Sequence, residues 1–561
     1  MFHESEPEPA AGRNAGDPRE HPREHPQENT QQVVVRGTDL RLLPAAAATW
    51  IGALAGLHLA EAPKRLWPLA IFAVVSLGLL VPSHTRIGAV ASFATCLSLV
   101  VASGAASALD EDPLTQAAAE QRYATVVGTV VKPPTPSSAK WKTDTLTTAI
   151  EVQELRLGKT WYGSDAGLRL EIGDVRDLDW VATNEIPKGT MIRFEGTVKE
   201  PSFINGTTIV GMSIDHFQVV RQAAAWQKTV AKLRSTMSQV TESAAGSLGP
   251  LITGMAIGDD DGLDRDAKQA MLTTSLTHLT AVSGSHIAIS LAVIHVLFRG
   301  RPKVQAVLVA GFLVLVLAVV GAEPSVVRAT SMSALAAWGM FRRRPGQPLA
   351  LLFTVVISVI LWDPWSAVSL GFALSAIATL GILTWGRAMA KSSQDWVDGF
   401  VKRLEGRPWW ERHQHVLSAV QWFLEATSDV VAISLSAYVV ALPVLSLVNP
   451  WLPTWGLLAN ILVAPIVAPL TLLGVSVAVT CLPVPAVAGV LARVAVPFAW
   501  WMNKVNMTLA TWPLARTPWP EGARGAVLLA VLLALTFVGA RCIRRIVRGR
   551  DRPFRCLESS T

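Results

Sequence analysis

Residues 303–322 read KVQAVLVAGFLVLVLAVVGA, and Lys303 is the only charged residue among them. An α-helix rises 1.5 Å per residue, so about 20 apolar residues cross the roughly 30 Å hydrocarbon core of a bilayer. Similar stretches recur along the chain, which is 51% hydrophobic and only 16% charged. Soluble domains usually carry about 25% charged residues. The sequence therefore predicts a polytopic α-helical membrane protein.

The apolar stretches predict about twelve transmembrane helices. A long polar region separates the first three from the other nine. We expect them near residues 42–60, 66–81, 87–109, 281–298, 303–322, 325–341, 347–362, 366–387, 428–449, 454–480, 484–505 and 524–542.

Charges in the connecting loops predict the orientation of these helices. Basic residues cluster at 299–303, 342–344, 391–403 and 544–550, whereas the turns GAEPS, WDPW and NPWLP are weakly charged. Cytoplasmic loops of membrane proteins are enriched in Lys and Arg. With about twelve helices, all the basic clusters lie on one side. We therefore expect a multi-pass protein of the cytoplasmic membrane with both termini in the cytoplasm, and this bias explains the net charge of +7.

Residues 120–221 have a different pattern. Runs such as YATVVGTVV and MIRFEGTVKE alternate with a period of two between Gly, Pro, Asn and Asp turns. This pattern predicts short strands, and the length suits a small barrel of the OB type. We expect an inserted extracytoplasmic all-β OB-like domain. DNA contact by this domain would involve Lys132, Lys140, Trp141 and Lys142, while Trp161, Tyr162, Phe194 and Phe203 either stack on bases or form its core.

The remaining divisions follow from composition. Residues 1–40 are rich in Pro, Glu, Arg and His and predict disorder. Four cysteines without a C-x-x-C pair predict neither a zinc site nor a disulfide framework. The expected parts are a disordered cytoplasmic tail (1–40), N-terminal transmembrane helices (41–110), the β domain (120–221), a linker helix with an acidic turn (222–270), a second transmembrane domain (271–542) with an amphipathic cytoplasmic insert (391–427), and a basic cytoplasmic tail (543–561).

One apolar stretch carries unusual polar residues. Residues 276–290 read LTHLTAVSGSHIAIS and contain His278, Ser283, Gly284 and His286. Polar groups at membrane depth are costly and usually face a bundle interior or a wet path. The Ser-Gly step either breaks the helix beside a cavity or packs helices closely through small residues.

This stretch resembles the hallmark segment of the ComEC competence family. GAEPSVVRATSM, DPWSAVSLGFALSAIATLGI and NILVAPIVAP resemble further segments of that family and occur in the expected order. We refer to residues 276–290 as the hallmark segment. Two positions depart from the family: Ser275 stands where Gly is frequent, and Ser285 stands where Leu is frequent.

The resemblance implies a channel that carries single-stranded DNA across the cytoplasmic membrane during natural transformation. Its partners would be single-stranded DNA, the lipid bilayer, a DNA receptor outside, a helicase or translocase inside, and a second copy of the chain in a homodimer. Arg328 would contact phosphate or pair with Glu323, and the serines would line the path or pack helices. The DNA pathway would involve His278, Ser283, Gly284, His286, Arg328, Ser331, Ser369, Ser375 and Asn460.

The resemblance also limits what is expected. Longer family members carry a metallo-β-lactamase-like nuclease domain, but this sequence has no H-x-H-x-D-H motif. We therefore expect no enzyme activity, no metal and no cofactor. The acidic run 258–266, GDDDGLDRD, does not match the EF-hand spacing and predicts a solvated turn. No Walker A motif occurs, so energy must come from a partner.

Two other functions remain open. Broken helices with polar residues at mid-depth also occur in secondary transporters, here for a smaller anionic solute. The remote alternative is an intramembrane hydrolase that uses Ser283 with His278 or His286.

Overall fold

The computed structural model describes residues 40–59, 86–136, 146–164, 166–172, 186–199, 208–342, 347–405 and 413–550. The expected helix at 66–81, both expected tails beyond residues 40 and 550, and Lys140, Trp141, Lys142 and Phe203 lie outside these residues.

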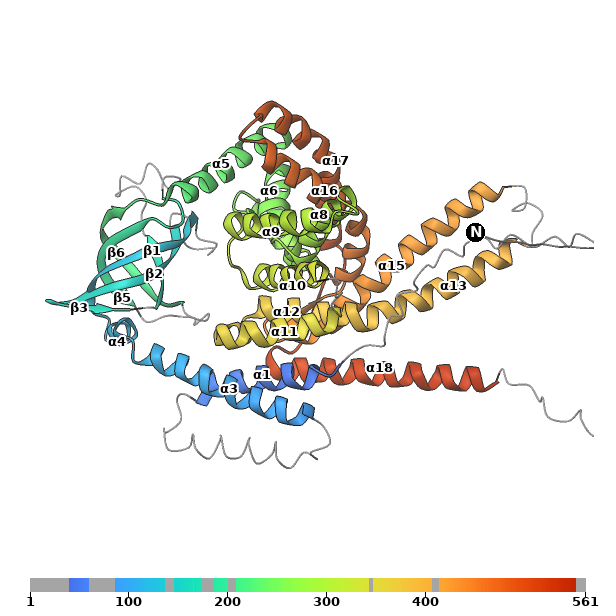
Figure 1. Ribbon diagram of the computed structural model, residues 1–561, viewed down its shortest axis with the longest axis horizontal. Coiled ribbons are helices and arrows are strands. Elements are labelled where there is room, and N and C mark those ends of the chain that lie inside the picture. Colours follow the sequence, from blue (N-terminus) through green and yellow to red (C-terminus); the bar gives the residue numbers. More distant parts are fainter. Residues whose placement is uncertain are drawn as a thin grey trace, which may run out of the picture. The chain divides into compact units, whose positions relative to one another are not determined.

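Long apolar helices dominate the described part of the chain, which agrees with the predicted membrane class (Figure 1). Seven of them are long and apolar enough to cross a bilayer, and three shorter apolar helices accompany them. The helices in these ten regions are α1 (Leu43–Leu59), α3 (Arg86–Asp110), α8 (Gly284–Leu297), α9 (Pro302–Val319), α11 (Pro348–Trp362), α12 (Leu370–Gly381), α15 (Gln414–Leu445), α16 (Gly456–Thr480), α17 (Pro485–Ala510) and α18 (Gly522–Arg550). Helix α10 (Pro324–Phe341) lies outside these ten regions and packs with α9 and α11.

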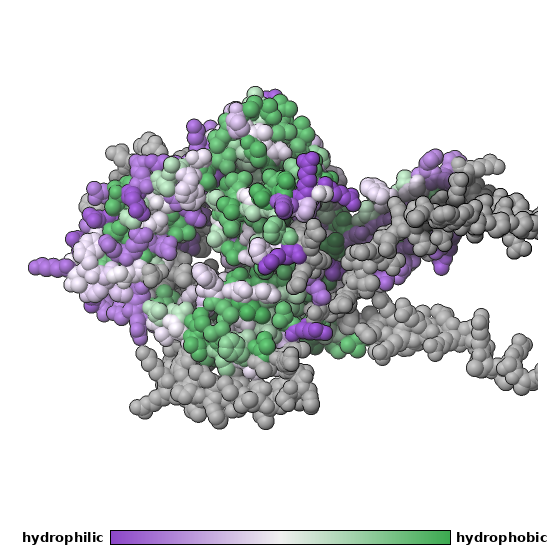
Figure 2. Space-filling view, viewed as in Figure 1, coloured by the Kyte–Doolittle hydropathy of each residue, from purple (hydrophilic) through white to green (hydrophobic). Residues whose placement is uncertain are grey.

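Apolar residues cover much of the surface of these helices. Figure 2 shows hydrophobic residues gathered over α9, α16 and α17, and hydrophilic residues over the strands. Side chains such as Val307, Val314 and Leu535 are largely exposed in the isolated chain. Exposed apolar surface on this scale is unfavourable in water, so these helices require a lipid environment.

The region 120–221 folds into a curled sheet, as its period-two pattern predicts. Its strands are β1 (Tyr123–Pro136), β2 (Leu146–Leu157), β3 (Thr160–Gly163), β4 (Gly167–Ile172), β5 (Met191–Lys199) and β6 (Thr208–Arg221). The strand order is β1-β5-β6-β4-β2-β3, and β1 also pairs with β2. The pairings β1–β2 and β1–β5 are antiparallel and β4–β6 is parallel, so the ladder returns to its first strand.

The inward face of this sheet forms an apolar core. Val126, Ile150, Leu168 and Phe194 belong to it, and α4 (Pro113–Ala119) adds Leu114. Phe194 is 0% exposed, so of the two roles predicted for it the core role is confirmed. Trp161 and Tyr162 on β3 are exposed, and the Arg156 guanidinium lies 5.5 Å from the Trp161 ring centre.

The expected linker helix covers only the first part of residues 222–270, and two further α-helices follow it. Helix α5 (Ala225–Ala245) covers the predicted segment, and α7 (Arg265–Thr274) ends the region. Between them α6 (Gly249–Ile257) is almost entirely buried and packs with α16 and α17 in one apolar core. The linker description is therefore wrong for 249–257, because nine apolar residues are too short to span a bilayer but long enough to fill a core.

Apart from His413, the described residues of the insert 391–427, which the sequence predicts to be amphipathic and cytoplasmic, belong to two long helices. Helix α12 continues through a π-helical turn (Ile382–Gly386) into α13 (Arg387–Glu405), and α15 begins at Gln414. Val397, Val401 and Leu417 form a small core between α13 and α15. Gly381 and Gly386 allow close approach to α15, because an added Cβ would meet Val440 at 2.5 Å and Ser436 at 2.8 Å respectively. The amphipathic pattern thus reflects helix pairing.

Candidate functional site

The hallmark segment starts where α7 stops. The Leu276 N–H donates to the Met271 carbonyl at 2.9 Å, and the Ser275 N–H donates to the Leu272 carbonyl at 3.3 Å. These two bonds form a Schellman motif, in which the residue after the helix adopts a left-handed conformation. Ser275 has φ 57°, which explains why glycine suits this position. Leu276 is buried beside Met271 and completes the motif.

The chain leaves the α-helical conformation between Ser275 and Ser283. A short 3₁₀ turn (Thr277–Leu279) is followed by an irregular stretch, and α8 begins at Gly284. His278 and His286 therefore do not lie on one continuous helix. Non-helical backbone at membrane depth is tolerated only where protein covers it or a wet cavity borders it.

His286 and Ser283 close the first turn of α8. The Ser283 N–H donates to His286 Nδ1 at 3.2 Å, while the Ser283 and Ser285 hydroxyls lie 2.6 Å apart. His286 is 3% exposed, and its Nε2 atom has no hydrogen-bond partner among the described residues. Buried polar atoms are nearly always paired, so an unpaired ring nitrogen marks a position where a polar ligand or water would be stabilised.

Arg328 lies directly over the start of α8. It is 5% exposed, and its Nε donates to the Ser375 hydroxyl at 2.8 Å, while Nη1 lies 3.4 Å from Met332 Sδ. A Cβ added to Gly284 would lie 2.9 Å from Arg328 Nη2, so the absence of a side chain at 284 makes room for the guanidinium. In the described chain Arg328 forms no ion pair with Glu323, and its positive charge is not neutralised by a carboxylate.

Three of the four sequence segments that carry the family resemblance therefore meet at one place. Ser325 in α10 donates to the Val282 carbonyl of the hallmark segment at 3.5 Å. Arg328 from the same helix reaches Gly284 in α8 and Ser375 in α12. We call Ser283, Gly284, His286, Arg328 and Ser375 the polar cluster. A guanidinium, an imidazole and hydroxyls in an apolar surrounding can bind an anion or a chain of waters.

A second set of polar contacts ties the hallmark segment to the acidic loop after α6. The Thr280 hydroxyl donates to Asp260 Oδ2 at 3.0 Å, and Lys268 Nζ lies 3.9 Å from Asp260 Oδ1. The Thr253 hydroxyl donates to the Asp259 carbonyl at 2.9 Å. Asp259 and Asp260 are therefore tied into the fold, whereas Asp261, Asp264 and Asp266 are exposed, as expected for a solvated turn.

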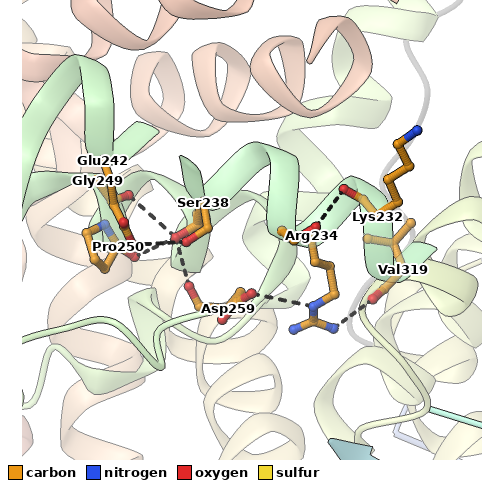
Figure 3. A network of polar contacts seen from close by, with 10 residues as sticks. Lys232, Arg234, Ser238, Glu242, Gly249, Pro250, Asp259 and Val319 are labelled. Atoms are coloured by element: carbon orange, nitrogen blue, oxygen red, sulfur yellow. Dashed lines mark hydrogen bonds and ion pairs between the residues drawn. The ribbon is translucent and has the colours of Figure 1, made fainter. Parts of the chain in front are cut away.

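Asp259 also connects this loop to α5. Arg234 Nε lies 3.6 Å from Asp259 Oδ2, and Arg234 Nη1 donates to the Val319 carbonyl at the end of α9 (Figure 3). One guanidinium thus joins three elements. Asp259 and Asp260 are each paired with a cation, and the described residues contain no group of three or more His, Cys, Asp or Glu placed to hold a metal ion.

Four of the predicted pathway residues lie apart from the polar cluster or have local roles. His278 is exposed and its Nδ1 lies 3.0 Å from the Ser275 carbonyl. The Ser369 hydroxyl caps α12 by accepting from the Phe372 N–H, and the Asn460 side chain donates to Gly456 within α16. Ser331 is half-buried in α10, one turn beyond Arg328.

Sequence reasoning missed Asn506. This residue is 0% exposed in α17, accepts from the Thr274 hydroxyl at 2.7 Å and donates to the Ala267 carbonyl at 3.2 Å. It fastens α7 immediately before the hallmark segment. A polar residue within a mostly apolar helix is the signal that could have indicated it.

The site does not show a hydrolase arrangement. His286 Nδ1 accepts from the Ser283 backbone N–H, and the Ser283 hydroxyl contacts Ser285. A nucleophilic serine requires a hydrogen bond from its own hydroxyl to the base. Here the His286 imidazole caps the N-terminus of α8 by accepting from the Ser283 N–H.

The fold and the polar cluster define a polytopic membrane protein whose core holds an uncompensated arginine. Residues 255–543, slightly more than half of the chain, match the family model described as Competence protein. The chain therefore belongs to the ComEC-type Competence protein family. No curated protein and no solved structure matches it.

Proposed function

We propose that this protein conducts single-stranded DNA across the cytoplasmic membrane during natural transformation, with the polar cluster on its path. Arg328 carries the proposal. Arg328 lies one turn into α10 and is buried, and a buried charge without a counter-charge is costly. A structural arginine would recover this cost from a carboxylate, but Arg328 contacts a hydroxyl and a thioether instead. A passing phosphate is the anion that its unused hydrogen-bonding capacity fits.

Weak contacts of this kind also suit a site that a DNA strand moves past. A conduit must bind its cargo firmly enough to admit it and weakly enough to release it. Such intermediate binding comes from the Arg328 guanidinium, the hydroxyls of Ser283 and Ser375, and His286 Nε2. With Arg328 5% exposed the path is closed, so transport requires α8, α10 and α12 to separate. A translocase or helicase inside the cell would supply the energy.

We further propose that the β domain is of the OB type and lies outside the cell. The support is its closed order of β1, β2, β4, β6 and β5, with β4 and β6 parallel. OB barrels bind single strands with aromatic and basic side chains. Trp161, Tyr162 and Arg156 are the described residues with this chemistry, and Lys132, Lys140, Trp141 and Lys142 remain candidates from the sequence.

The matched family domain is a membrane domain without enzymatic activity, so removal of the second strand falls to another protein. An external DNA receptor and a second copy of the chain are the other proposed partners. We propose cytoplasmic termini on the basis of the loop charges.

Uptake of labelled DNA tests this function. Cells that carry Arg328→Gln should accumulate roughly a tenth or less of the protected intracellular DNA of the parent, because one charge-assisted phosphate contact is lost. Ser331→Ala, on the same helix, should leave uptake unchanged. Membrane levels of each variant are measured by immunoblotting. Parental uptake in a deletion strain or in Arg328→Gln would refute the proposal.

A further inference from the structure

A small ribbon of two strands lies beside α7. Strands β7 (Trp451–Pro453) and β8 (Arg516–Pro518) pair antiparallel, with Trp451 opposite Pro518 and Pro453 opposite Arg516. The Thr454 and Thr517 hydroxyls lie 2.6 Å apart and join the ribbon further. Strand β7 belongs to the weakly charged NPWLP turn, which the loop charges place outside the cell. The ribbon is therefore a candidate for the outer face of the pathway.

Arg516 is exposed yet held in one orientation. Its Nε and Nη2 atoms donate to the Thr273 hydroxyl at 3.0 and 2.7 Å, and its guanidinium lies 4.9 Å from the Trp451 ring centre. Among the described residues it has no carboxylate partner. A planar cation fixed on an aromatic ring loses little freedom when a base stacks on it or a phosphate binds it.

A second aromatic pair stands next to the ribbon. The Trp455 and Trp512 rings are 5.3 Å apart at 85°, and Trp455 Nε1 donates to the Pro513 carbonyl at 3.0 Å. Trp512 is 42% exposed and Leu514, two residues further, is 73% exposed. Leu514 has φ 57°, a strained conformation for a branched side chain. The apolar side chains of Trp512 and Leu514 are thus exposed on the surface.

A pocket of about 260 Å³ adjoins this surface. The residues that line it include Arg516, Thr273, Met507, Thr511, Asp266 and Gln269. The Asp266 carboxylate disfavours a phosphate there, whereas the Asp266 and Gln269 oxygens can accept hydrogen bonds from N–H groups of a base, such as N3–H of thymine.

This surface connects directly to the hallmark segment. Thr273, which holds Arg516, is two residues before Ser275. The Tyr438 hydroxyl donates to the Pro453 carbonyl, and a Cβ on Gly456 would lie 3.2 Å from the Ser275 Cβ. The ribbon, α7 and the start of the hallmark segment are therefore neighbours.

We propose that Trp451, Trp512 and Arg516 form a docking platform for single-stranded DNA at the extracytoplasmic mouth of the passage. This inference rests on the proposed function and adds the site where the strand is received. Bases stack on Trp512 and on the outer face of the Arg516 guanidinium, and the charge of Arg516 attracts the backbone. Exposed π-faces exist only in unpaired DNA, so the platform selects single strands over duplexes.

The alternative is that these tryptophans are ordinary membrane-interface anchors. Trp362 offers a matched control, since it is 91% exposed in the WDPW turn on the same predicted side. No arginine-aromatic contact is found at Trp362 among the described residues. An interface role predicts equal behaviour of Trp362 and Trp512, whereas the platform predicts that only Trp512 affects DNA binding.

The test uses the full chain in lipid nanodiscs and a fluorescent 12-base oligothymidylate, with anisotropy read at fixed salt. Trp512→Leu and Arg516→Gln should each weaken binding about tenfold, as expected for one stacked base. Trp512→Phe should restore most of the affinity, and Trp362→Leu should not change it. An abasic oligonucleotide should bind more weakly than oligothymidylate and be insensitive to Trp512→Leu.

Equal affinity of the parent, Trp512→Leu and Arg516→Gln would overturn the platform, and so would equal losses for Trp512→Leu and Trp362→Leu. Failure of the platform is separable from failure of the proposed function. Normal oligonucleotide binding by both platform variants, together with lost uptake in Arg328→Gln, would reject the platform alone. Retained uptake in Arg328→Gln would reject the conduit, whatever the platform binds.

Discussion

Ser275 adopts a left-handed backbone conformation at the end of α7, with φ 57°. Residues other than glycine lose roughly 1–2 kcal/mol in this region because Cβ crowds the carbonyl oxygen. The bonds of the Schellman motif hold it there all the same. Ser275 starts the break in the helix, so its backbone strain lies at the beginning of the non-helical stretch that leads to Ser283.

Ser275→Gly should therefore stabilise the protein by roughly 1 kcal/mol, because glycine adopts the same φ without a Cβ clash. The midpoint of thermal unfolding in detergent, at one heating rate, should rise. Ser331→Gly in the middle of α10 should destabilise the protein by about 0.5–1 kcal/mol and so lower the midpoint, since glycine weakens a helix interior. A lower midpoint for Ser275→Gly would show that the conformation at 275 is not the one described.

Asn506→Leu should lower stability by about 1–3 kcal/mol, because the Ala267 carbonyl and Thr274 hydroxyl lose a buried partner. Asn503→Leu is the matched control one turn earlier in α17, where the side chain is only half-buried. The readout is again the unfolding midpoint. Equal effects of the two substitutions would contradict a specific role of Asn506 in fastening α7.

At the scale of elements, short apolar segments and helix pairs were hardest to predict. The sequence pattern placed α9 and α16 well, because long uncharged runs have one stable environment. The nine residues of α6 lack the length of a span, and only their burial against α16 and α17 reveals them as core. Likewise α13 and α15 bury an amphipathic face against each other, which resembles a membrane-surface pattern in sequence.

The link between α5 and the acidic loop also depends on tertiary contacts. A double-mutant cycle of Arg234→Gln and Asp259→Asn should give a coupling energy of about 0.5–1 kcal/mol, as both side chains are partly buried. The exposed pair Arg122 and Glu120 should give a value near zero. Hydrogen exchange supplies the energies, read in residues 258–264 for the first pair and in residues 117–124 for the exposed pair. A coupling energy at Arg234–Asp259 as small as that of the exposed pair would show that this ion pair does not connect α5 to the acidic loop.

At the scale of the whole molecule, the membrane class, the β region and the family could be read from the sequence. The hallmark segment was recognised from His278, Ser283, Gly284 and His286, yet only three of these belong to the polar cluster. The contacts of Arg328 with Gly284 and Ser375 join residues that are far apart in sequence. Periodicity carries no information on such contacts, and so the composition of the cluster required the structure.

The central claim is that the polyanion passes along the hallmark segment. A single strand with a photoreactive base, stalled during uptake by a bulky 3′ end, tests it in cells expressing the protein. Cross-links mapped by mass spectrometry should fall within residues 277–286 and around Arg328 and Ser375. Cross-links confined to other helices during normal uptake would contradict the account.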